Sequence, residues 1–180
     1  MKLEQAKQIA EEVKGWLEPY CKRIEIAGSI RRQKSEVNDV EILCIPKQPY
    51  LFGHYSDNVD QHISELIDAK LLSYRCNKKG QVVYGIKNKL LTHVASGFPL
   101  DIFITNEEWW PVALVVRTGP KASNIKIAMA AKKKGWKFRA YGSGFTIYNP
   151  CSGEQEKIIC KSEREVFEAV GLEYLEPERR

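Results

Sequence analysis

Two acidic residues stand at alternate positions in an apolar stretch of the sequence, where they could bind a divalent metal ion. The stretch covers residues 24–45, and its second apolar run carries Asp39 and Glu41. Because side chains on a β-strand alternate between its two faces, both carboxylates point to one side, opposite to their apolar neighbours. Carboxylates this close repel each other unless a cation lies between them, and their hard oxygen atoms suit Mg²⁺.

A glycine–serine pair, Gly28 and Ser29, lies between the two apolar runs. A turn made of such small residues lets backbone N–H groups approach an anion. A phosphate-binding turn beside an acidic pair is the outline of a site for nucleotidyl transfer. An Asp-x-Glu pattern alone is more often the solvated face of a strand, so the interpretation depends on the turn and on a further acid.

The further acid is Asp101, which lies inside the apolar run of residues 100–104. A carboxylate in such surroundings is costly unless it is paired with a cation or ligates a metal. The alternative, a residue at a strand end that faces water, is less favourable with apolar neighbours on both sides. We therefore take Asp39, Glu41 and Asp101 as the candidate catalytic and metal-binding residues.

The elements that would position these acids follow from the period of the apolar residues. Helical spacing predicts helices over residues 3–17, 57–70, 107–116, 122–134 and 162–171. The last of these begins with a capping box, Ser162-x-x-Glu165. A period of two predicts strands over residues 24–27, 39–45, 71–75, 82–87, 89–95 and 99–104, and two more between 136 and 148. This mixture predicts an α+β fold.

The amino-acid composition favours a globular protein and argues against a membrane, secreted or zinc-binding protein. A chain of 180 residues with 43% hydrophobic and 28% charged residues is typical of a soluble globular protein with one core or two small subdomains. No apolar run is long enough to span a membrane, and the acidic N-terminal helix is unlike a signal peptide. The 5 cysteines include no Cys-x-x-Cys pair, which favours reduced thiols in an intracellular protein and argues against a zinc site.

Positive charge gathers in a segment without acids. Residues 109–153 contain no Asp or Glu, although the net charge of the whole chain is only +5. Its basic residues are Arg117, Lys121, Lys126, Lys132, Lys133, Lys134, Lys137 and Arg139. A solvated helix face is the ordinary origin of a charge run, but such faces usually mix the two signs. The segment therefore predicts a surface that meets the phosphates of a polyanion.

Three stretches resemble the family X DNA polymerases, which belong to the nucleotidyltransferase superfamily. The first is Gly-Ser-x-Arg-Arg at residues 28–32, followed by Asn-Asp-x-Glu at 38–41, and the second is Leu-Asp-Ile-Phe at 100–103. The third combines Arg-Thr-Gly-Pro at 117–120 with the ending Tyr-x-x-Pro-x-x-Arg at 174–180. The first two stretches would specify only the superfamily, whereas the third is typical of the polymerase family. The resemblance covers nearly the whole chain and is to small viral members.

The resemblance implies two subdomains. Residues 1–105 would form a nucleotidyltransferase-type palm, a mixed sheet flanked by helices that carries the active site. Residues 106–180 would form a small α+β subdomain that binds the nucleotide and the nascent base pair. An N-terminal lyase domain and helix-hairpin-helix modules are not expected. The three acids would bind two Mg²⁺ ions, with Mn²⁺ as the alternative, to join a primer 3′-OH to the α-phosphate of a dNTP.

The resemblance also assigns the contacts to nucleotide and DNA. The candidate nucleotide-binding residues are Gly28, Ser29, Arg32, Asn38, Arg117, Thr118, Gly119 and Asn124. The candidate DNA-binding residues are Lys121, Lys126, Lys132, Lys133, Lys134 and Arg139. Three residues depart from the pattern of the family, and a phosphate-binding basic residue that some members carry ahead of the first helix would fall before Met1. Arg117 follows a valine where an aromatic pair is common, Ala128 replaces an arginine that reads the template side, and Pro99 replaces an arginine that orients the third acid.

The predicted function is a template-directed DNA polymerase that fills short gaps in DNA repair with low processivity and modest fidelity. Its partners would be gapped or primer–template DNA and dNTP, and the protein would act as a monomer, in viral or bacterial cytoplasm. Three alternatives stay open: template-independent terminal transfer, nucleotidyl transfer to another substrate, and a DNA-binding protein without catalysis. Three carboxylates near phosphates argue against the last of these.

Overall fold

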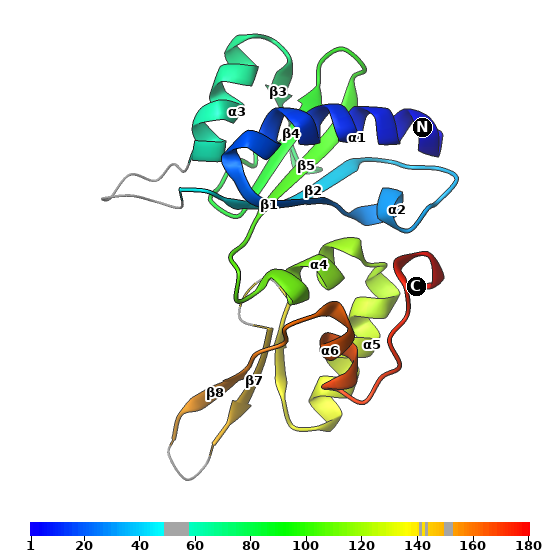
Figure 1. Ribbon diagram of the computed structural model, residues 1–180, viewed down its shortest axis with the longest axis vertical. Coiled ribbons are helices and arrows are strands. Elements are labelled where there is room, and N and C mark those ends of the chain that lie inside the picture. The colour runs from blue at the N-terminus through cyan, green and yellow to red at the C-terminus, as the bar shows by residue number, and fades with distance from the viewer. Residues whose placement is uncertain (49–57, 141, 143, 150–152) are drawn as a thin grey trace. The chain divides into compact units, whose positions relative to one another are not determined.

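The computed structural model describes residues 1–48, 58–140, 142, 144–149 and 153–180. The chain divides into two compact units, Met1–Thr105 and Asn106–Arg180, each with a hydrophobic core of its own (Figure 1). Both units combine helices with an antiparallel or mixed sheet, which confirms the predicted α+β class. In the part of the chain that the structure describes, no helix is long and apolar enough to cross a membrane.

The first unit is built on a five-stranded mixed sheet. In chain order its elements are α1 (Leu3–Leu17), the 3-10 helix η1 (Glu18–Tyr20), β1 (Cys21–Ile26), α2 (Gly28–Arg31), β2 (Val40–Pro46), α3 (Asn58–Asp68), β3 (Leu72–Tyr74), β4 (Asn88–His93) and β5 (Phe98–Ile104). The strand order is β1-β2-β5-β4-β3. The β2–β5 pair is parallel and the other neighbours are antiparallel.

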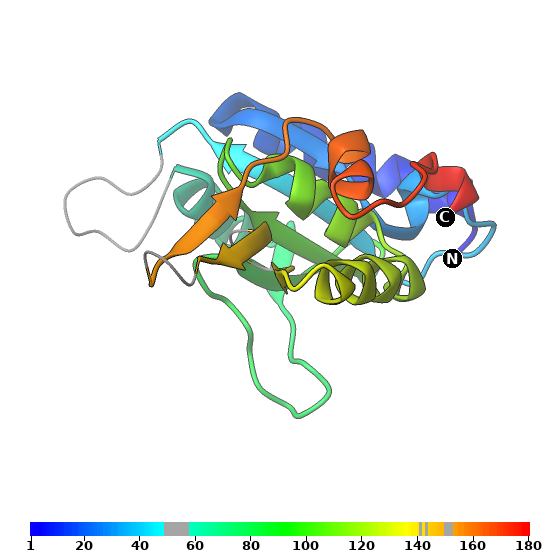
Figure 2. The same cartoon turned by 90° about the horizontal axis from the view of Figure 1, so that it is seen from below.

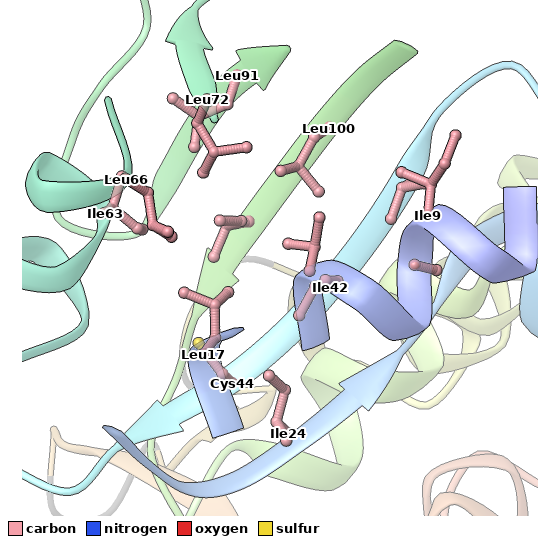
Figure 3. Close-up of a cluster of buried hydrophobic side chains, with 14 of the residues drawn as sticks. Ile9, Leu17, Ile24, Ile42, Cys44, Ile63, Leu66, Leu72, Leu91 and Leu100 are labelled. Carbon is pink, nitrogen blue, oxygen red and sulfur yellow. The ribbon is translucent and has the colours of Figure 1, made fainter. Parts of the chain in front are cut away.

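The core of the first unit lies against one face of this sheet (Figure 3). Helix α1 buries residues at helical spacing, among them Ile9 and Leu17, and α3 contributes Ile63. They pack with alternate residues of the strands, such as Ile42 and Leu100. Because successive strand residues point to opposite faces, the residues between these apolar positions lie on the face away from this core. The acids of β2 and β5 are among them.

The second unit packs three helices with a three-stranded antiparallel sheet. Its elements are α4 (Trp110–Thr118), α5 (Lys121–Lys133), β6 (Lys137–Arg139), β7 (Gly144–Tyr148), β8 (Gln155–Ile158), α6 (Glu163–Glu168) and the 3-10 helix η2 (Pro177–Arg179). The strand order is β6-β7-β8. Phe145 of β7 and Val166 of α6 are fully buried in its core. The Ser162 hydroxyl accepts a hydrogen bond from the Glu165 backbone N–H, as the capping box predicts.

Several predictions of local structure need correction. The predicted strand 82–87 is wrong, because this segment makes only isolated bridges, Cys76 with Val82 and Tyr84 with Lys89. The predicted turn at Gly28 is instead the first residue of the short helix α2. Strand β8 was not predicted, because three of its four residues are exposed and polar and give no apolar alternation. Helix α4 begins at Trp110 and continues to Thr118, and residue 57 of the predicted second helix lies outside the described residues.

Candidate active site

The pairing of two strands brings the predicted acids to one end of the first sheet. Strands β2 and β5 are parallel neighbours, and their register places Glu41 directly beside Asp101. Asp39 comes immediately before the first residue of β2. All three carboxylates are partly exposed, while Val40 and Ile42 between them are fully buried in the core. The alternation read from the sequence is therefore confirmed for β2.

An arginine that sequence reasoning missed holds the third acid. The Arg75 guanidinium, which follows β3, forms an ion pair with the Asp101 carboxylate. It is fixed at its other side, because Arg75 Nε donates to the Leu91 carbonyl at 3.0 Å. Pro99 is uncharged, so the cation beside Asp101 comes from the residue that follows β3. No local motif marks Arg75, since the two residues are 26 positions apart.

Asp39 is half-buried, and its pKa shows how far the surrounding charges stabilise the ionised carboxylate. Burial raises the pKa of Asp39 above its usual value, because desolvation penalises the charged carboxylate, and this outweighs the positive charges of Arg75 and Arg32, which lower it. The two arginines therefore compensate the ionised acid only in part. A further cation beside Asp39 would favour the ionised form.

Glu41 lies so close to Gly28 that no side chain fits at position 28. A Cβ atom there would overlap with the Glu41 carboxylate, and the backbone of Gly28 has a φ of 63°, in the left-handed region that favours glycine. The Ala27 N–H donates to the Glu41 carbonyl at 2.8 Å and fixes the approach of the two segments. The absence of a side chain at Gly28 thus allows the start of α2 to lie in contact with the Glu41 carboxylate.

The predicted phosphate-binding residues lie around α2. The Ser29 hydroxyl is buried, and within the described residues it has no hydrogen-bond partner. Arg32 follows the last residue of α2 and is near enough to Asp39 to lower its pKa. Asn38 is exposed and precedes Asp39 directly. A buried hydroxyl without a partner, beside a guanidinium and the start of a helix, offers suitable donors for a phosphate oxygen.

The donor set fits a hard divalent cation. Three carboxylates on two neighbouring strands supply the oxygen ligands that Mg²⁺ prefers, and the incompletely compensated Asp39 would gain from added positive charge. Over residues 1–48, 58–140, 142, 144–149 and 153–180, no three His, Cys, Asp or Glu side chains are already arranged as a metal site. Arg75 contacts Asp101 through one carboxylate oxygen, Oδ1, and a carboxylate can be shared between a guanidinium and a metal ion through its two oxygens.

In the second unit, four of the predicted nucleotide-binding residues gather at the junction of α4 and α5. Arg117 and Thr118 end α4, and Gly119 follows with a φ of 65°. Asn124 Nδ2 donates to the Val116 carbonyl at 2.9 Å, which ties α5 to the end of α4. Its buried Oδ1 has no hydrogen-bond partner among the described residues. The junction thus presents one unused acceptor.

The predicted DNA-binding lysines lie along α5 and just after it. Lys121, Lys126, Lys132 and Lys133 are exposed, on a helix that contains no acid. Lys134 is partly engaged within the unit, because its Nζ donates to the Ala169 carbonyl at 2.7 Å and lies 5.0 Å from the ring centroid of Trp136. The Arg139 guanidinium donates to Gln155 Oε1 at 3.3 Å. Helix α5 therefore presents four exposed lysines and no acid.

The sequence is similar to known DNA polymerases. A family model described as DNA polymerase beta thumb matches residues 113–180. "Repair DNA polymerase X" of African swine fever virus is 29% identical over 159 residues, which cover 88% of this chain and 82% of the viral protein. "DNA polymerase/3'-5' exonuclease PolX" of Bacillus subtilis is 27% identical over 177 residues, which cover 97% of this chain and 27% of the bacterial protein.

The fold is similar to that of a solved polymerase. Polymerase beta of Leishmania infantum in its ternary P/T complex superposes with a TM-score of 0.77 at 17% identity, over 100% of this chain and 76% of that one. The ternary gap complex of the same polymerase gives a TM-score of 0.79 at 17% identity, over 100% and 70%. At this level of identity the likeness concerns the fold.

Proposed function

The chain belongs to the family X DNA polymerases, and from this premise we propose that it is a DNA-directed DNA polymerase of DNA repair. In the proposed reaction, the 3′-OH of a primer attacks the α-phosphate of a dNTP that pairs with the template, and pyrophosphate leaves. The observation that carries the proposal is the register of β2 and β5, which sets Glu41 beside Asp101 and just after Asp39. We assign the chemistry to the first unit and base-pair recognition to the second.

The three carboxylates act as the metal ligands of the proposed reaction. Asp39 and Glu41 would hold both ions, and Asp101 would hold the ion nearer the primer terminus. Two Mg²⁺ ions, or Mn²⁺ ions, supply positive charge for the attacking and leaving oxygens when bound. Arg75 keeps the Asp101 carboxylate on the reacting face of the sheet. The hydrogen bond from Arg75 Nε to the Leu91 carbonyl holds the guanidinium in this position.

The triphosphate is bound by residues around α2. The Ser29 hydroxyl, which lacks a partner within the described chain, donates to a phosphate oxygen. Arg32 forms charge-assisted hydrogen bonds to the β- and γ-phosphates. Gly28 lets the backbone come close to the ligand, and Asn38 adds a backbone contact beside Asp39. These donors stabilise negative charge where pyrophosphate forms.

Selectivity in this proposal comes from the second unit. We assign the contact with the incoming sugar and base to Thr118 and Gly119, which are both buried in the structure and have to become accessible when the nucleotide binds. Asn124 reaches the minor-groove edge, where the available base atoms are mostly acceptors, and its Nδ2 carries a second N–H besides the one donated to the Val116 carbonyl. Ala128 is too short to reach the template side, which favours modest fidelity. The lysines of α5 follow the DNA backbone, and a grip of this size favours short-gap filling with low processivity.

An incorporation assay with a matched pair of variants tests the proposal. The substrate is a duplex with a one-nucleotide gap, supplied with Mg²⁺ and each dNTP singly. We expect only the complementary nucleotide to be added. Asp101→Asn should lower the rate by roughly 10²-fold or more, because a bound metal contributes several kcal/mol to transition-state stabilisation. Asp68→Asn makes the same chemical change at an exposed site at the end of α3 and should leave the rate unchanged.

Other outcomes separate the alternatives. Equal addition of all four nucleotides would indicate terminal transfer instead of templated synthesis. Binding of the gapped duplex without any addition would indicate a DNA-binding protein without catalysis. Unchanged turnover in Asp101→Asn would remove this residue from the site.

A further inference from the structure

A lysine is buried on the core face of the first sheet. Lys89 lies in β4 beside the buried Ile102 of β5, and its side chain is 0% exposed. Its Nζ lies 2.8 Å from Oδ1 of the Asp60 carboxylate on α3. Taking two charges out of water is costly, and apolar residues of similar volume often give equal or greater stability. Stability alone therefore does not account for this pair. Unlike apolar residues, it makes contacts of fixed direction.

The Lys89 ammonium joins three segments of the chain. Besides Asp60 of α3, it donates to the Gly85 carbonyl at 3.0 Å, and it lies 5.3 Å from the centroid of the Tyr84 ring. Burial and the negative charge of Asp60 raise the pKa of Tyr84, which is consistent with this ring lying beside the same carboxylate. Helix α3, strand β4 and residues 83–85, which belong to the connection between β3 and β4, are thus held at one point.

Residues 83–85, which we call the base of the connection, lie against the end of β3. The Tyr84 ring packs edge-on against the ring of Tyr74, with 5.2 Å between the centroids. Tyr74 is the last residue of β3 and directly precedes Arg75. The middle of the connection extends away from the sheet of its unit (Figure 2). A displacement of the base would therefore move the residue in front of Arg75.

The backbone of β4 holds Arg75 directly. The Arg75 N–H donates to the Leu90 carbonyl at 3.0 Å, and Arg75 Nε donates to the Leu91 carbonyl at 3.0 Å. The two acceptors are the residues that follow Lys89, and Leu90 is also the β4 partner of Asp101, on the face away from the core. The buried lysine thus adjoins the backbone that sets the Arg75 guanidinium against the third acid.

We propose that Lys89 is a positioning residue for the third acid. Its contacts to the α3 carboxylate and to the base of the connection fix the start of β4, and these segments set where Arg75 holds the Asp101 carboxylate. An apolar pair in the same place would keep the packing but would leave the base of the connection able to shift. The inference rests on the proposed polymerase function, because Asp101 is assigned there as a metal ligand.

A double variant separates positioning from stability. Lys89→Met with Asp60→Leu replaces the ion pair by apolar side chains, which should restore most of the stability that Lys89→Met alone loses. On gapped DNA we expect kcat of the double variant to stay about 10-fold or more below wild type, since a displacement of about an ångström at a reacting centre costs about 10²-fold. The KM for dNTP should stay close to the wild-type value, because the proposed triphosphate site lies around α2.

Two further variants complete the comparison. Tyr84→Leu keeps the buried ion pair but removes the ring contact to Tyr74, so it should also lower kcat without changing the KM for dNTP. The matched control is Lys7→Met with Glu4→Leu. It makes the same chemical changes at an exposed ion pair of α1, whose charged atoms are 3.1 Å apart, and should leave kcat unchanged.

A spectroscopic measurement tests the inference without turnover and without metal. In ¹H–¹⁵N spectra of the metal-free protein, the shift of the Arg75 Nε–H resonance depends on its hydrogen bond to the Leu91 carbonyl. The variant Arg75→Lys assigns this resonance by its absence. We expect the resonance to move by more than its linewidth in the double variant at Lys89 and Asp60, and to stay in place in the α1 control.

Recovery of both stability and wild-type kcat in the double variant would overturn the inference, because the ion pair would then have only a structural role. An Arg75 resonance that stays in place would overturn it as well, and so would an equal loss of kcat in the control. The proposed function fails separately, if the wild-type protein adds no nucleotide to gapped DNA. Circular dichroism melting of each variant establishes that it is folded.

Discussion

Gly28→Ala tests whether the close approach of α2 to the acids is needed for catalysis. An alanine at a φ of 63° is disfavoured by about 1–2 kcal/mol relative to its ordinary backbone conformation. Its Cβ would overlap with the Glu41 carboxylate, so Glu41 has to adopt a poorer rotamer at a cost of about 0.5–1.5 kcal/mol. The lower entropy of the unfolded alanine chain offsets about 0.4–1 kcal/mol. The net loss of unfolding free energy is therefore about 1–2.5 kcal/mol.

The effect on turnover should exceed the effect on stability. Glu41 has to move by about an ångström to make room, and a displacement of that size at a reacting centre costs about 10²-fold in rate. Gly15→Ala is the matched control, because Gly15 lies in α1, and an added Cβ there meets no heavy atom within 4 Å. A helix interior favours alanine over glycine by about 0.5–1 kcal/mol, so this variant should be slightly more stable, with unchanged turnover.

Urea denaturation and single-nucleotide incorporation on gapped DNA measure the two effects. The reasoning predicts that Gly28→Ala stays folded at room temperature and loses most of its turnover. A variant that lost stability but kept wild-type turnover would refute the role of the Glu41 carboxylate. A variant with unchanged stability would refute the described packing of Gly28 against Glu41.

Two further predictions concern buried charge in the first unit. Because burial raises the folded-state pKa of Asp39, its ionised form costs stability above that pKa, and the cost disappears as pH falls through it. Asp39→Asn should therefore raise the unfolding free energy at pH 7 while abolishing turnover, and a gain in urea denaturation that did not shrink toward pH 4 would contradict the reasoning. Lys89→Met should lower the unfolding free energy by about 3–5 kcal/mol, because Lys89 is 0% exposed and its removal leaves the buried Asp60 carboxylate without its cation. The double variant Lys89→Met with Asp60→Leu should recover most of this loss in the same measurement, and a double variant as unstable as the single one would indicate that steric packing dominates.

The spacing of apolar residues along the sequence was sufficient to predict the helices and strands that have one continuous buried face. Helix α1 matches its predicted bounds because Ala6, Ile9, Val13 and Leu17 recur at helical spacing on the side that meets the sheet. The acids of β2 were predictable for the same reason, since a period of two fixes which side chains share a face. Such patterns report the environment of each residue along one element.

What the patterns do not report is how elements are paired. The contact between Arg75 and Asp101 depends on two registers, Tyr74 opposite Leu91 in β3–β4 and Leu90 opposite Asp101 in β4–β5. A shift of one residue in either register would turn the guanidinium to the other face of the sheet. The sequence contains the charge of Arg75 but no local signal for these pairings, so the residue that holds the third acid was found only in the structure.

The proposed catalytic residues and the proposed selectivity residues also differ in how the structure holds them. The acids lie on strands whose register is fixed by many buried residues, so their relative positions are determined by the core of the first unit. The proposed selectivity residues lie at a helix junction, where the side chain of Asn124 donates a hydrogen bond to the Val116 carbonyl at 2.9 Å. A single hydrogen bond contributes about 0.5–1.5 kcal/mol, which is small enough for an incoming base pair to replace it. In the proposed reaction, the acids would therefore be held in place by packing, whereas the side chain of Asn124 could change its hydrogen-bond partner at a small cost.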